Sequence, residues 1–394
     1  MRRVAIIGVG MTDVGVFEDA TPMELGVNAI VDAVNDAGVD KNDIESVVTT
    51  PVGYVLDSQK FVAQRMVEYL GIPTRTMAEI DCGGASSLAA LRYAAHEVAG
   101  GRIDTALVYA SHWEFTTGQM LARYAEDTHL VRMANSLYGS YDSRYGVISP
   151  MAHYAMCIQR YMLECGVEAE QIAALPVVLR ENASKNPRAM FAEQISVEDV
   201  LSSKMLSPPV HLLESCPMSH GAAAVVLTSE ENASETCERP VVLTGYGEAH
   251  DDSHFIPSSG DMSRFPSVQR SAREAYEAAL IGSSDVDVAE VYGVFAGVEL
   301  MCYEELGFFE RGQAPAAVEK GRTRAGGDVA INTSGGRLSL GHAPYATPLF
   351  EVFEVVSQLR GEAGDRQVPG ARVGLVQAEH GMINGSIVFV LEAV

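Results

Sequence analysis

The feature that most constrains the fold is a faint internal repeat, which relates the first part of the chain to the last. The matching pairs, in chain order, are 3–10 (RVAIIGVG) and 240–247 (PVVLTGYG), 23–37 and 267–280, 43–48 and 288–292, 82–84 and 334–336, and 107–112 (LVYASH) and 375–380 (LVQAEH). Apolar strand-like runs alternate with helical patterns in both copies. Two copies of one β/α alternation in the same order predict two similar halves that pack together.

The chain between the repeats, from Ser111 to about Leu213, has no counterpart in the second copy. It carries two helical-looking runs and several tyrosines: Tyr124, Tyr138, Tyr141, Tyr145, Tyr154 and Tyr161. We interpret it as a cap over a site made by the two halves; the alternative is an extra subdomain in which the tyrosines only pack. The expected boundaries are 1–112 for the first half, 113–213 for the cap, 214–238 for return strands of the first half, and 239–394 for the second half.

A cysteine marks the turn in the third unit of the first half. The apolar run 77–80 predicts a strand, and the glycine turn after Cys82 leads into a run of helical periodicity. Unpaired N–H groups and the dipole at a helix N-terminus favour thiolate over thiol, which makes Cys82 a candidate nucleophile. The alternative is inert packing, since cysteines are among the most buried residues.

Composition excludes several classes of protein. A chain of 394 residues with 47% hydrophobic residues can form two core-forming units, and no apolar run approaches the roughly 18 residues that a membrane span needs. The short N-terminal apolar run lacks a cleavage site, so we expect a cytoplasmic protein with no membrane association. A formal charge of −24 argues against nucleic acid as a partner. The six cysteines form no CxxC pair, which argues against disulfides and a metal site.

Taken together, these features resemble the thiolase superfamily, and within it the sterol-carrier-protein-type branch. The resemblance covers the whole chain. Its matching stretches are NPRA at 186–189, CP at 216–217 before GAAAVVL at 221–227, ELGF at 305–308, NTSGG at 332–336, and GH at 341–342 followed by QLRG at 358–361. It implies an α/β thiolase fold, in which two duplicated βαβαβαββ halves form a five-layered αβαβα core with an inserted loop domain.

The same resemblance implies catalytic roles for two residues. Cys82 stands where a thiolase cysteine takes the acyl group from coenzyme A. His342, after Gly341, stands where a Gly-His-Pro histidine deprotonates that cysteine and helps to hold the thioester oxyanion; the proline is displaced here to Pro344.

Two departures from the family pattern leave the proton chemistry open. Tyr292 replaces the asparagine or histidine that fixes a water in the oxyanion hole, and it could donate a hydrogen bond or act as an acid. The turn that carries a second cysteine in thiolases has none here, and Glu379 and His380 are the nearest substitutes for that base. The alignment does not say which of the two points inward, and His380 could equally be a structural histidine. Tyr345 is either a further proton carrier or a residue at the pocket edge.

Three functions follow as hypotheses. The first, which we favour at this point, is an acyltransferase that makes or cleaves a carbon–carbon bond next to a coenzyme A thioester through acyl-Cys82. The second is a retro-aldolase on β-hydroxyacyl-CoA, including steroid side chains, in which Tyr292 and Tyr345 handle protons. The third is a non-catalytic subunit of a complex, against which the Cys82–His342 pair argues.

Partners follow from the resemblance as well. Coenzyme A is expected as a substrate rather than a bound cofactor, with Arg188 and Arg180 near its phosphates and Gly341 and Gly381 beside its path. The resemblance also implies a homodimer, which we expect to pair through an edge strand at 105–110, and a small partner protein with an OB-fold and a zinc ribbon.

Overall fold

A computed structural model describes residues 2–53, 61–113, 150–252, 261–381 and 384–394. The strands of its main sheet are β1 (Val4–Met11), β2 (Ser46–Thr49), β3 (Thr76–Glu79), β4 (Thr105–His112), β7 (Gly221–Ser229), β8 (Val241–His250), β9 (Val288–Val291), β10 (Ala330–Ile331), β11 (Val373–Glu379) and β12 (Gly385–Ala393). A separate hairpin consists of β5 (Met205–Ser207) and β6 (Val210–His211). The helices are α1 (Pro22–Ala37), α2 (Val62–Leu70), α3 (Ser86–Ala99), α6 (Pro150–Cys165), α7 (Ala169–Ala183), α8 (Val197–Ser202), α9 (Glu230–Thr236), α10 (Pro266–Ala279), α11 (Ala296–Glu305), α12 (Ala314–Glu319), α13 (Gly336–Ser339) and α14 (Thr347–Arg360).

The strand order confirms the duplicated fold that the sequence repeat predicts. The order in the main sheet is β10-β9-β11-β12-β8-β1-β7-β4-β2-β3. Read from its two ends, this order gives two five-stranded sheets in which equivalent strands take equivalent places: β3-β2-β4-β7-β1 and β10-β9-β11-β12-β8. In each sheet the first three strands are parallel and the remaining neighbours antiparallel. The two sheets are joined by antiparallel pairing of β1 with β8.

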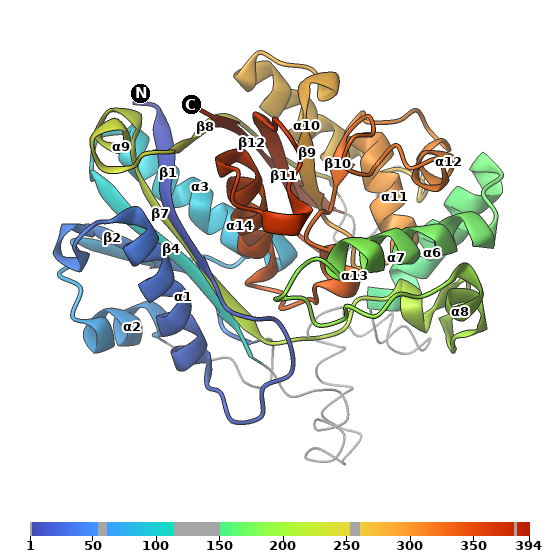
Figure 1. Ribbon diagram of the computed structural model, residues 1–394, viewed down its shortest axis with the longest axis horizontal. Helices are drawn as coiled ribbons and strands as arrows, with labels where there is room; N and C mark the ends of the chain where they lie inside the picture. The colour runs from blue at the N-terminus through green and yellow to red at the C-terminus, as the bar shows by residue number, and fades with distance from the viewer. Residues whose placement is uncertain (1, 54–60, 114–149, 253–260, 382–383) are drawn as a thin grey trace.

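Three buried clusters separate the layers of the molecule (Figure 1). One lies between α1, α2 and the first sheet, one holds α3 and α14 between the two sheets, and one lies between the second sheet and α10 and α11. Strands such as β4 contribute to two clusters, because Leu107 faces α1 while Val108 faces α3. A strand buried on both faces needs apolar residues at every position, which explains the continuous apolar runs in the sequence. The five-layered αβαβα thiolase fold is thereby confirmed.

The repeated Gly-x-Gly pairs have a packing reason. A Cβ at Gly8 would lie 2.2 Å from the carbonyl oxygen of Ala33 in α1, and a Cβ at its repeat counterpart Gly245 would lie 2.3 Å from that of Ala275 in α10. Since real Cβ atoms do not approach backbone this closely, only glycine lets α1 and α10 pack against their strands at this distance. The glycines that mark the repeat therefore mark equivalent helix–strand contacts.

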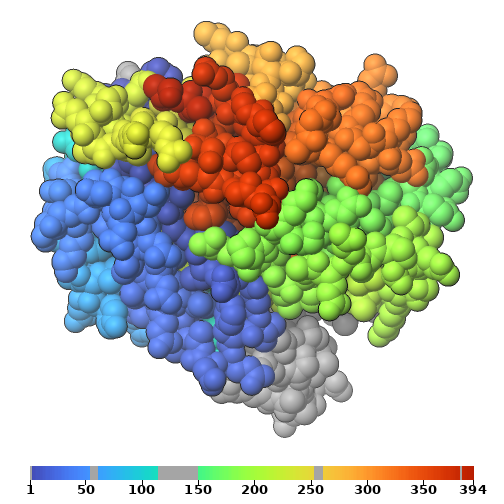
Figure 2. All heavy atoms as spheres, viewed as in Figure 1, coloured from blue at the N-terminus to red at the C-terminus, as the bar shows by residue number. Residues whose placement is uncertain are grey.

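The described part of the insertion packs on the second half of the molecule. Its helices α6 and α7 contact α11, and α7 also contacts α12 and α13 (Figure 1). Figure 2 shows the green surface of this segment continuing into the orange surface of the second half. Four of the tyrosines noted above, Tyr124, Tyr138, Tyr141 and Tyr145, lie outside the described residues. The boundaries of a cap at 113–213 stay a prediction.

The prediction that 105–110 forms the edge strand is wrong. These residues belong to β4, which lies between β2 and β7, and the exposed edge of the first sheet is β3. The error has a topological cause, because the crossover through α3 carries the chain from β3 past β2 before β4 joins the sheet. The pairing of 82–84 with 334–336 implies a helix directly after 334–336, as α3 follows Cys82. The structure has only the four-residue helix α13 there, and α14, the equivalent of α3, begins after His342.

No helix among the described residues is both long enough and apolar enough to cross a membrane.

Candidate active site

The turn that carries Cys82 is bound to the end of β11. Cys82 precedes a single 3-10 turn, Gly83–Ala85, that leads into α3. Gly83 has a φ of +69°, and a Cβ there would lie 1.9 Å from the carbonyl oxygen of His380. The N–H of Gly84 donates to that same oxygen over 2.8 Å. The two halves therefore meet at the turn that carries Cys82 and at the strand end that carries Glu379 and His380.

The thiol of Cys82 lies in acidic surroundings. Its backbone N–H donates to Ser86 Oγ over 2.9 Å. Burial and then the carboxylate of Glu248 raise the pKa of the thiol to about 12; Asp81 adds to this effect and Arg92 opposes it. The helix N-terminus was expected to favour thiolate, but desolvation and two carboxylates outweigh that preference in the resting chain.

His342 is fixed through its backbone. Its N–H donates to the carbonyl oxygen of Pro217 over 3.1 Å, and its own carbonyl oxygen accepts from the N–H of Ser219 over 2.9 Å. Gly341 before it has a φ of +118°, and a Cβ there would lie 2.7 Å from Val14 Cγ1. The glycine of the Gly-His motif is therefore required by both conformation and space.

The imidazole of His342 is buried and neutral. Its Nδ1 lies 3.4 Å from Thr347 Oγ1. Burial lowers its pKa well below the usual range, and the charges of Arg337 and His112 lower it further. Within the described chain, no hydrogen bond or ion pair links His342 to Cys82, so their catalytic pairing stays a prediction.

Two tyrosines and a glutamate form a buried row beside the Cys82 turn. The hydroxyls of Tyr154, on α6, and Tyr292, after β9, lie 3.2 Å apart, and Tyr154 donates to Glu379 Oε2, at the end of β11, over 3.1 Å. All three side chains are buried. A Cβ at Gly84 would lie 3.5 Å from Tyr292 Cε2 and 2.7 Å from the carbonyl oxygen of Glu379. Hydroxyls at these distances can pass a proton between Tyr292 and Glu379.

His380 points to a different environment from Glu379. Its Nε2 lies 3.6 Å from Glu248 Oε1, and its ring centroid is 5.5 Å from that of His250. Burial lowers its pKa, which Glu248 opposes. Gly381 follows with a φ of +112°, a conformation that favours glycine. Of the two candidates that the sequence left open, Glu379 is therefore the one linked to Tyr292, through the hydroxyl of Tyr154.

A buried cation lies against the same row. The guanidinium carbon of Arg337 is 4.2 Å from the ring centroid of Tyr292. Arg337 is 1% exposed, and its Nε and Nη2 donate to the two carboxylate oxygens of Glu351 over 2.8 and 3.1 Å. The site thus holds a positive charge on the face of the tyrosine that replaces the family's asparagine.

Tyr345 is connected to His342 through His112. Its ring centroid is 5.8 Å from that of His112, whose charge lowers the pKa of His342. Tyr345 itself is buried. It belongs to the surroundings of His342 rather than to the row at Tyr292.

The two arginines expected to meet coenzyme A lie apart from these residues. The guanidinium of Arg180 is 4.5 Å above the ring of Phe191, and its Nη1 donates to the carbonyl oxygen of Glu193 over 3.5 Å. Burial lowers the pKa of Arg180. No contact joins Arg180 to Arg188 within the described residues, and a role in binding phosphate stays a prediction for both.

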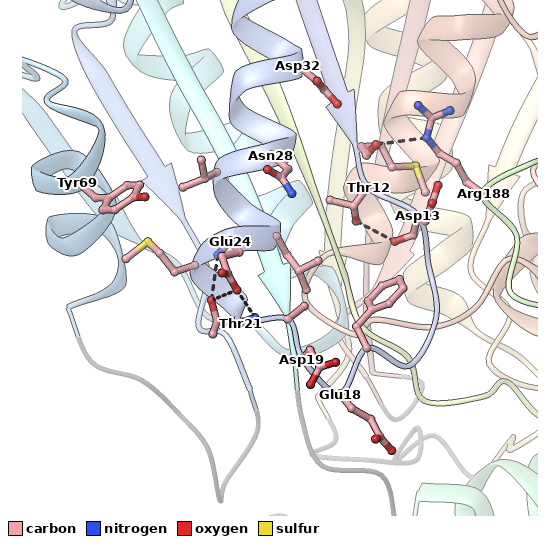
Figure 3. Close-up of a pocket in the computed structure, with 16 residues that line it drawn as sticks. Thr12, Asp13, Glu18, Asp19, Thr21, Glu24, Asn28, Asp32, Tyr69 and Arg188 are labelled. Atoms are coloured by element: carbon pink, nitrogen blue, oxygen red, sulfur yellow. Dashed lines mark hydrogen bonds between the residues drawn. The ribbon is translucent and has the colours of Figure 1, made fainter.

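Arg188 borders a cleft of about 1250 Å³, and the charged side chains of its lining are acidic apart from Arg188 itself. Its Nε donates to the carbonyl oxygen of Met11 over 3.2 Å. Figure 3 shows the carboxylates along this cleft: Asp13, Glu18, Asp19, Glu24 and Asp32. One cation among these carboxylates makes a poor site for phosphates, because the field repels anions. Neither in this cleft nor elsewhere among the described residues do His, Cys, Asp and Glu side chains form a group of three or more that could hold a metal ion.

Sequence reasoning missed three members of the site. Tyr154 was one tyrosine among several in the insertion, and only the fold brings it to Glu379. Arg337 was not considered, although it is a lone arginine beside the leucines of the stretch RLSL before Gly341, a pattern that can indicate a buried functional charge. His112 was noted only as the repeat counterpart of His380.

Comparison with known proteins places the chain in a family. Residues 4–231 match the model "Thiolase, N-terminal domain", and residues 247–393 match "Thiolase C-terminal domain-like". The chain belongs to the thiolase family.

Its relatives include enzymes of two kinds. The chain is 34% identical to acetyl-CoA acetyltransferase of Methanothermobacter thermautotrophicus, over 95% of each chain. It is 29% identical to 17-hydroxy-3-oxo-4-pregnene-20-carboxyl-CoA lyase of Mycobacterium tuberculosis over 98% of each, and 29% identical to human sterol carrier protein 2 over 99% of this chain and 72% of that protein. The solved structure of the "Ltp2-ChsH2(DUF35) aldolase" superposes with a TM-score of 0.84 at 25% identity, over 99% of this chain and 98% of that one. The resemblance to the sterol-carrier-protein-type branch is confirmed.

Proposed function

We propose that this chain cleaves a carbon–carbon bond next to the thioester of a β-hydroxyacyl-CoA, as a retro-aldolase. The observation that carries the proposal is the buried row of Tyr292, Tyr154 and Glu379 beside the Cys82 turn. A retro-aldol step needs a group that takes the proton of the β-hydroxyl and a group that returns a proton to the α-carbon. It needs no nucleophile, which agrees with a thiol whose pKa lies at about 12.

The reaction runs in two steps on these residues. Glu379, through Tyr154, holds the proton that Tyr292 releases, and Tyr292 takes the proton of the β-hydroxyl. The bond between Cα and Cβ then breaks, a carbonyl group forms on the departing fragment, and the electron pair passes into the thioester enolate. Neutral His342 donates a hydrogen bond to the enolate oxygen. A proton returned to Cα, for which Tyr345 is the proposed donor, completes the shorter acyl-CoA.

The second candidate is acyl transfer through acyl-Cys82. It is favoured by the position of Cys82 at a helix-opening turn and by relatives that are acetyl-CoA acetyltransferases. It ranks second because substrate would have to overcome the burial and the negative charge of Glu248 that hold the thiol protonated. A non-catalytic role is the weakest candidate, since burying Glu379 and Arg337 costs free energy that a scaffold does not need to spend.

Partners are part of the proposal. Coenzyme A enters as part of the substrate. The chain is proposed to dimerise through β3, whose outer edge pairs with no described strand and whose Met77 is 40% exposed. An exposed strand edge of this kind readily pairs with its copy about a two-fold axis. The two-component name of the similar aldolase supports a second protein component as a partner; that this partner is small and has an OB-fold and a zinc ribbon stays a prediction from the family resemblance.

Turnover of two substrate classes tests the proposal. The protein, with any co-purifying partner retained, is incubated with β-hydroxyacyl-CoA esters, including steroid side chains, and separately with β-ketoacyl-CoA plus free coenzyme A. We expect a carbonyl product from the first class alone, undiminished in Cys82→Ala and reduced at least about 100-fold in Tyr292→Phe, within the range of a general acid–base contribution. Cleavage of the β-ketoacyl-CoA that Cys82→Ala abolishes would refute the lyase and establish acyl transfer.

A further inference from the structure

The environment of Tyr292 contains a buried ion pair that neither function explains. The guanidinium carbon of Arg337 lies 4.2 Å from the centroid of the phenol ring, and the guanidinium donates two hydrogen bonds to Glu351. Its remaining nitrogen, Nη1, is buried and has no hydrogen-bond partner among the described residues. Replacing such a pair by apolar residues is often neutral or stabilising, so stability alone does not account for it.

We propose that Arg337 is a positioning residue that stabilises the phenolate of Tyr292, and that Glu351 limits how strongly it does so. A cation already attracts the face of a neutral aromatic ring through the ring quadrupole. When the phenol ionises, the negative charge spreads into the ring, and a full charge pair forms in a site of low dielectric. The cation therefore favours the ionised ring over the neutral one. The inference rests on the proposed function only for the use that is made of Tyr292.

The other titratable groups that interact with Arg337 do not supply a positive charge. His342, in the loop after α13, is neutral because burial and Arg337 lower its pKa. Burial raises the pKa of Cys216, before β7, to about 12 and that of Glu299, on α11, to about 8, so both keep their protons at neutral pH.

The remaining neighbours carry protons or negative charge. Tyr154, on α6, bridges to the carboxylate of Glu379, at the end of β11, and Cys302, on α11, is a buried thiol with a raised pKa. An ionised Glu379 opposes a negative charge on Tyr292, and a Glu379 that has taken up the phenol proton is neutral, so in neither state does it supply a positive charge. Among the described groups, Arg337 is thus the one that can offset the charge left on Tyr292.

The ionisation of Tyr292 can be measured without substrate. The ultraviolet difference spectrum between a protein and its Tyr292→Phe counterpart isolates one phenol, and its pH dependence gives the midpoint of ionisation. Removing the whole pair in Arg337→Met/Glu351→Met avoids leaving one buried charge alone, and we expect the midpoint to rise by at least about one pH unit, which is a ten-fold change in proton affinity. In Glu351→Gln the cation keeps its place without its counter-ion, and the midpoint should fall.

A matched control separates this effect from general loss of a buried pair. Glu354, on α14 one turn from Glu351, forms a second largely buried ion pair with Arg366, in the 3-10 turn Gly364–Arg366 after α14. Neither residue contacts Tyr292 among the described residues. Arg366→Met/Glu354→Met should leave the midpoint unchanged. An unchanged midpoint in both Arg337→Met/Glu351→Met and Glu351→Gln, with native circular dichroism, would overturn the inference.

Activity then distinguishes this inference from the proposed function. If the midpoint shifts as expected, the acidic limb of the pH–rate profile should move with it, as for a base whose proton affinity has changed. A shifted midpoint in a protein that cleaves no β-hydroxyacyl-CoA would support the inference and overturn the proposed function. A structural role for Arg337 would lower stability and leave both midpoint and profile in place.

Discussion

Replacing Glu299 by glutamine should remove a pH-dependent loss of stability. Glu299 is buried on α11, where Oε1 accepts hydrogen bonds from Tyr303 over 2.5 Å and from Asn332 Nδ2 over 2.6 Å. Its Oε2 is buried without a hydrogen-bond partner among the described residues. Burial, opposed by these two hydrogen bonds, raises the pKa of the carboxyl group from 4.5 to about 8. Glutamine keeps the shape and the accepting oxygen but cannot ionise.

The sign and size of the effect follow from proton binding. The folded protein keeps the proton of Glu299 up to about pH 8, whereas the unfolded chain loses it near 4.5. Between these values the unfolded state binds fewer protons, so the free energy of unfolding of the wild type falls as pH rises, by about 1.4 kcal/mol per pH unit. Over the two units from pH 5 to pH 7 the loss amounts to about 3 kcal/mol. Glu299→Gln lacks this loss.

Urea unfolding at pH 5 and at pH 7 measures the difference. The stability of Glu299→Gln relative to the wild type should grow by about 3 kcal/mol between the two values. Glu277→Gln, an exposed glutamate on α10, is the matched control and should show no such growth. If the difference in the free energy of unfolding between Glu299→Gln and the wild type is the same at both pH values, the carboxyl group of Glu299 ionises normally. That result would refute the view that Glu299 is neutral at pH 7.

Three further predictions address other parts of the site and the assembly. At neutral pH, Cys82 should react with iodoacetamide about 10- to 100-fold more slowly than a free cysteine, because its thiolate is scarce although intrinsically more nucleophilic. Glu248→Gln should speed the reaction. Peptide mass mapping that finds Cys82 reacting as fast as a free thiol would contradict this account. Gly293→Ala should cost about 1–3 kcal/mol in urea unfolding, because the new Cβ would lie 1.9 Å from Glu299 Oε2; adding Glu299→Ala should restore part of the loss, whereas additive costs would exclude the clash. Met77→Lys should place a lysine of each copy at the proposed β3 contact, and the repulsion should shift the chain toward monomer. Light scattering measures the mass of the assembly, and an unchanged mass would rule out that contact.

Much of the fold could be predicted because the sequence repeats itself. The repeat gave two halves, and glycines such as Gly8 and Gly245 report helix–strand contacts that no other residue allows. The edge strand could not be predicted, because a parallel crossover carries β4 past β2 to the interior of the sheet. Chain order alone does not fix the order of parallel strands in space.

The sequence identified candidate residues more readily than the contacts that these residues make in the folded chain. Glu379 and His380 are adjacent, and successive side chains at a strand end point to opposite faces, so a one-residue uncertainty reverses which one points inward. Tyr154 reaches Tyr292 across 138 positions of sequence, a contact that depends on how α6 packs. The thiol of Cys82 has a raised pKa because folding buries it and brings Glu248 near it. In each case the property belongs to a contact between distant segments.

The most direct measurement is the intact-protein mass after brief incubation with acetyl-CoA, propionyl-CoA and acetoacetyl-CoA, for the wild type and for Cys82→Ala. The account predicts no acyl-sized gain on either protein, together with cleavage of a β-hydroxyacyl-CoA by both. An acyl-sized gain on the wild type that is absent from Cys82→Ala would contradict it and would show that Cys82 is the nucleophile of a thiolase-type acyl transfer.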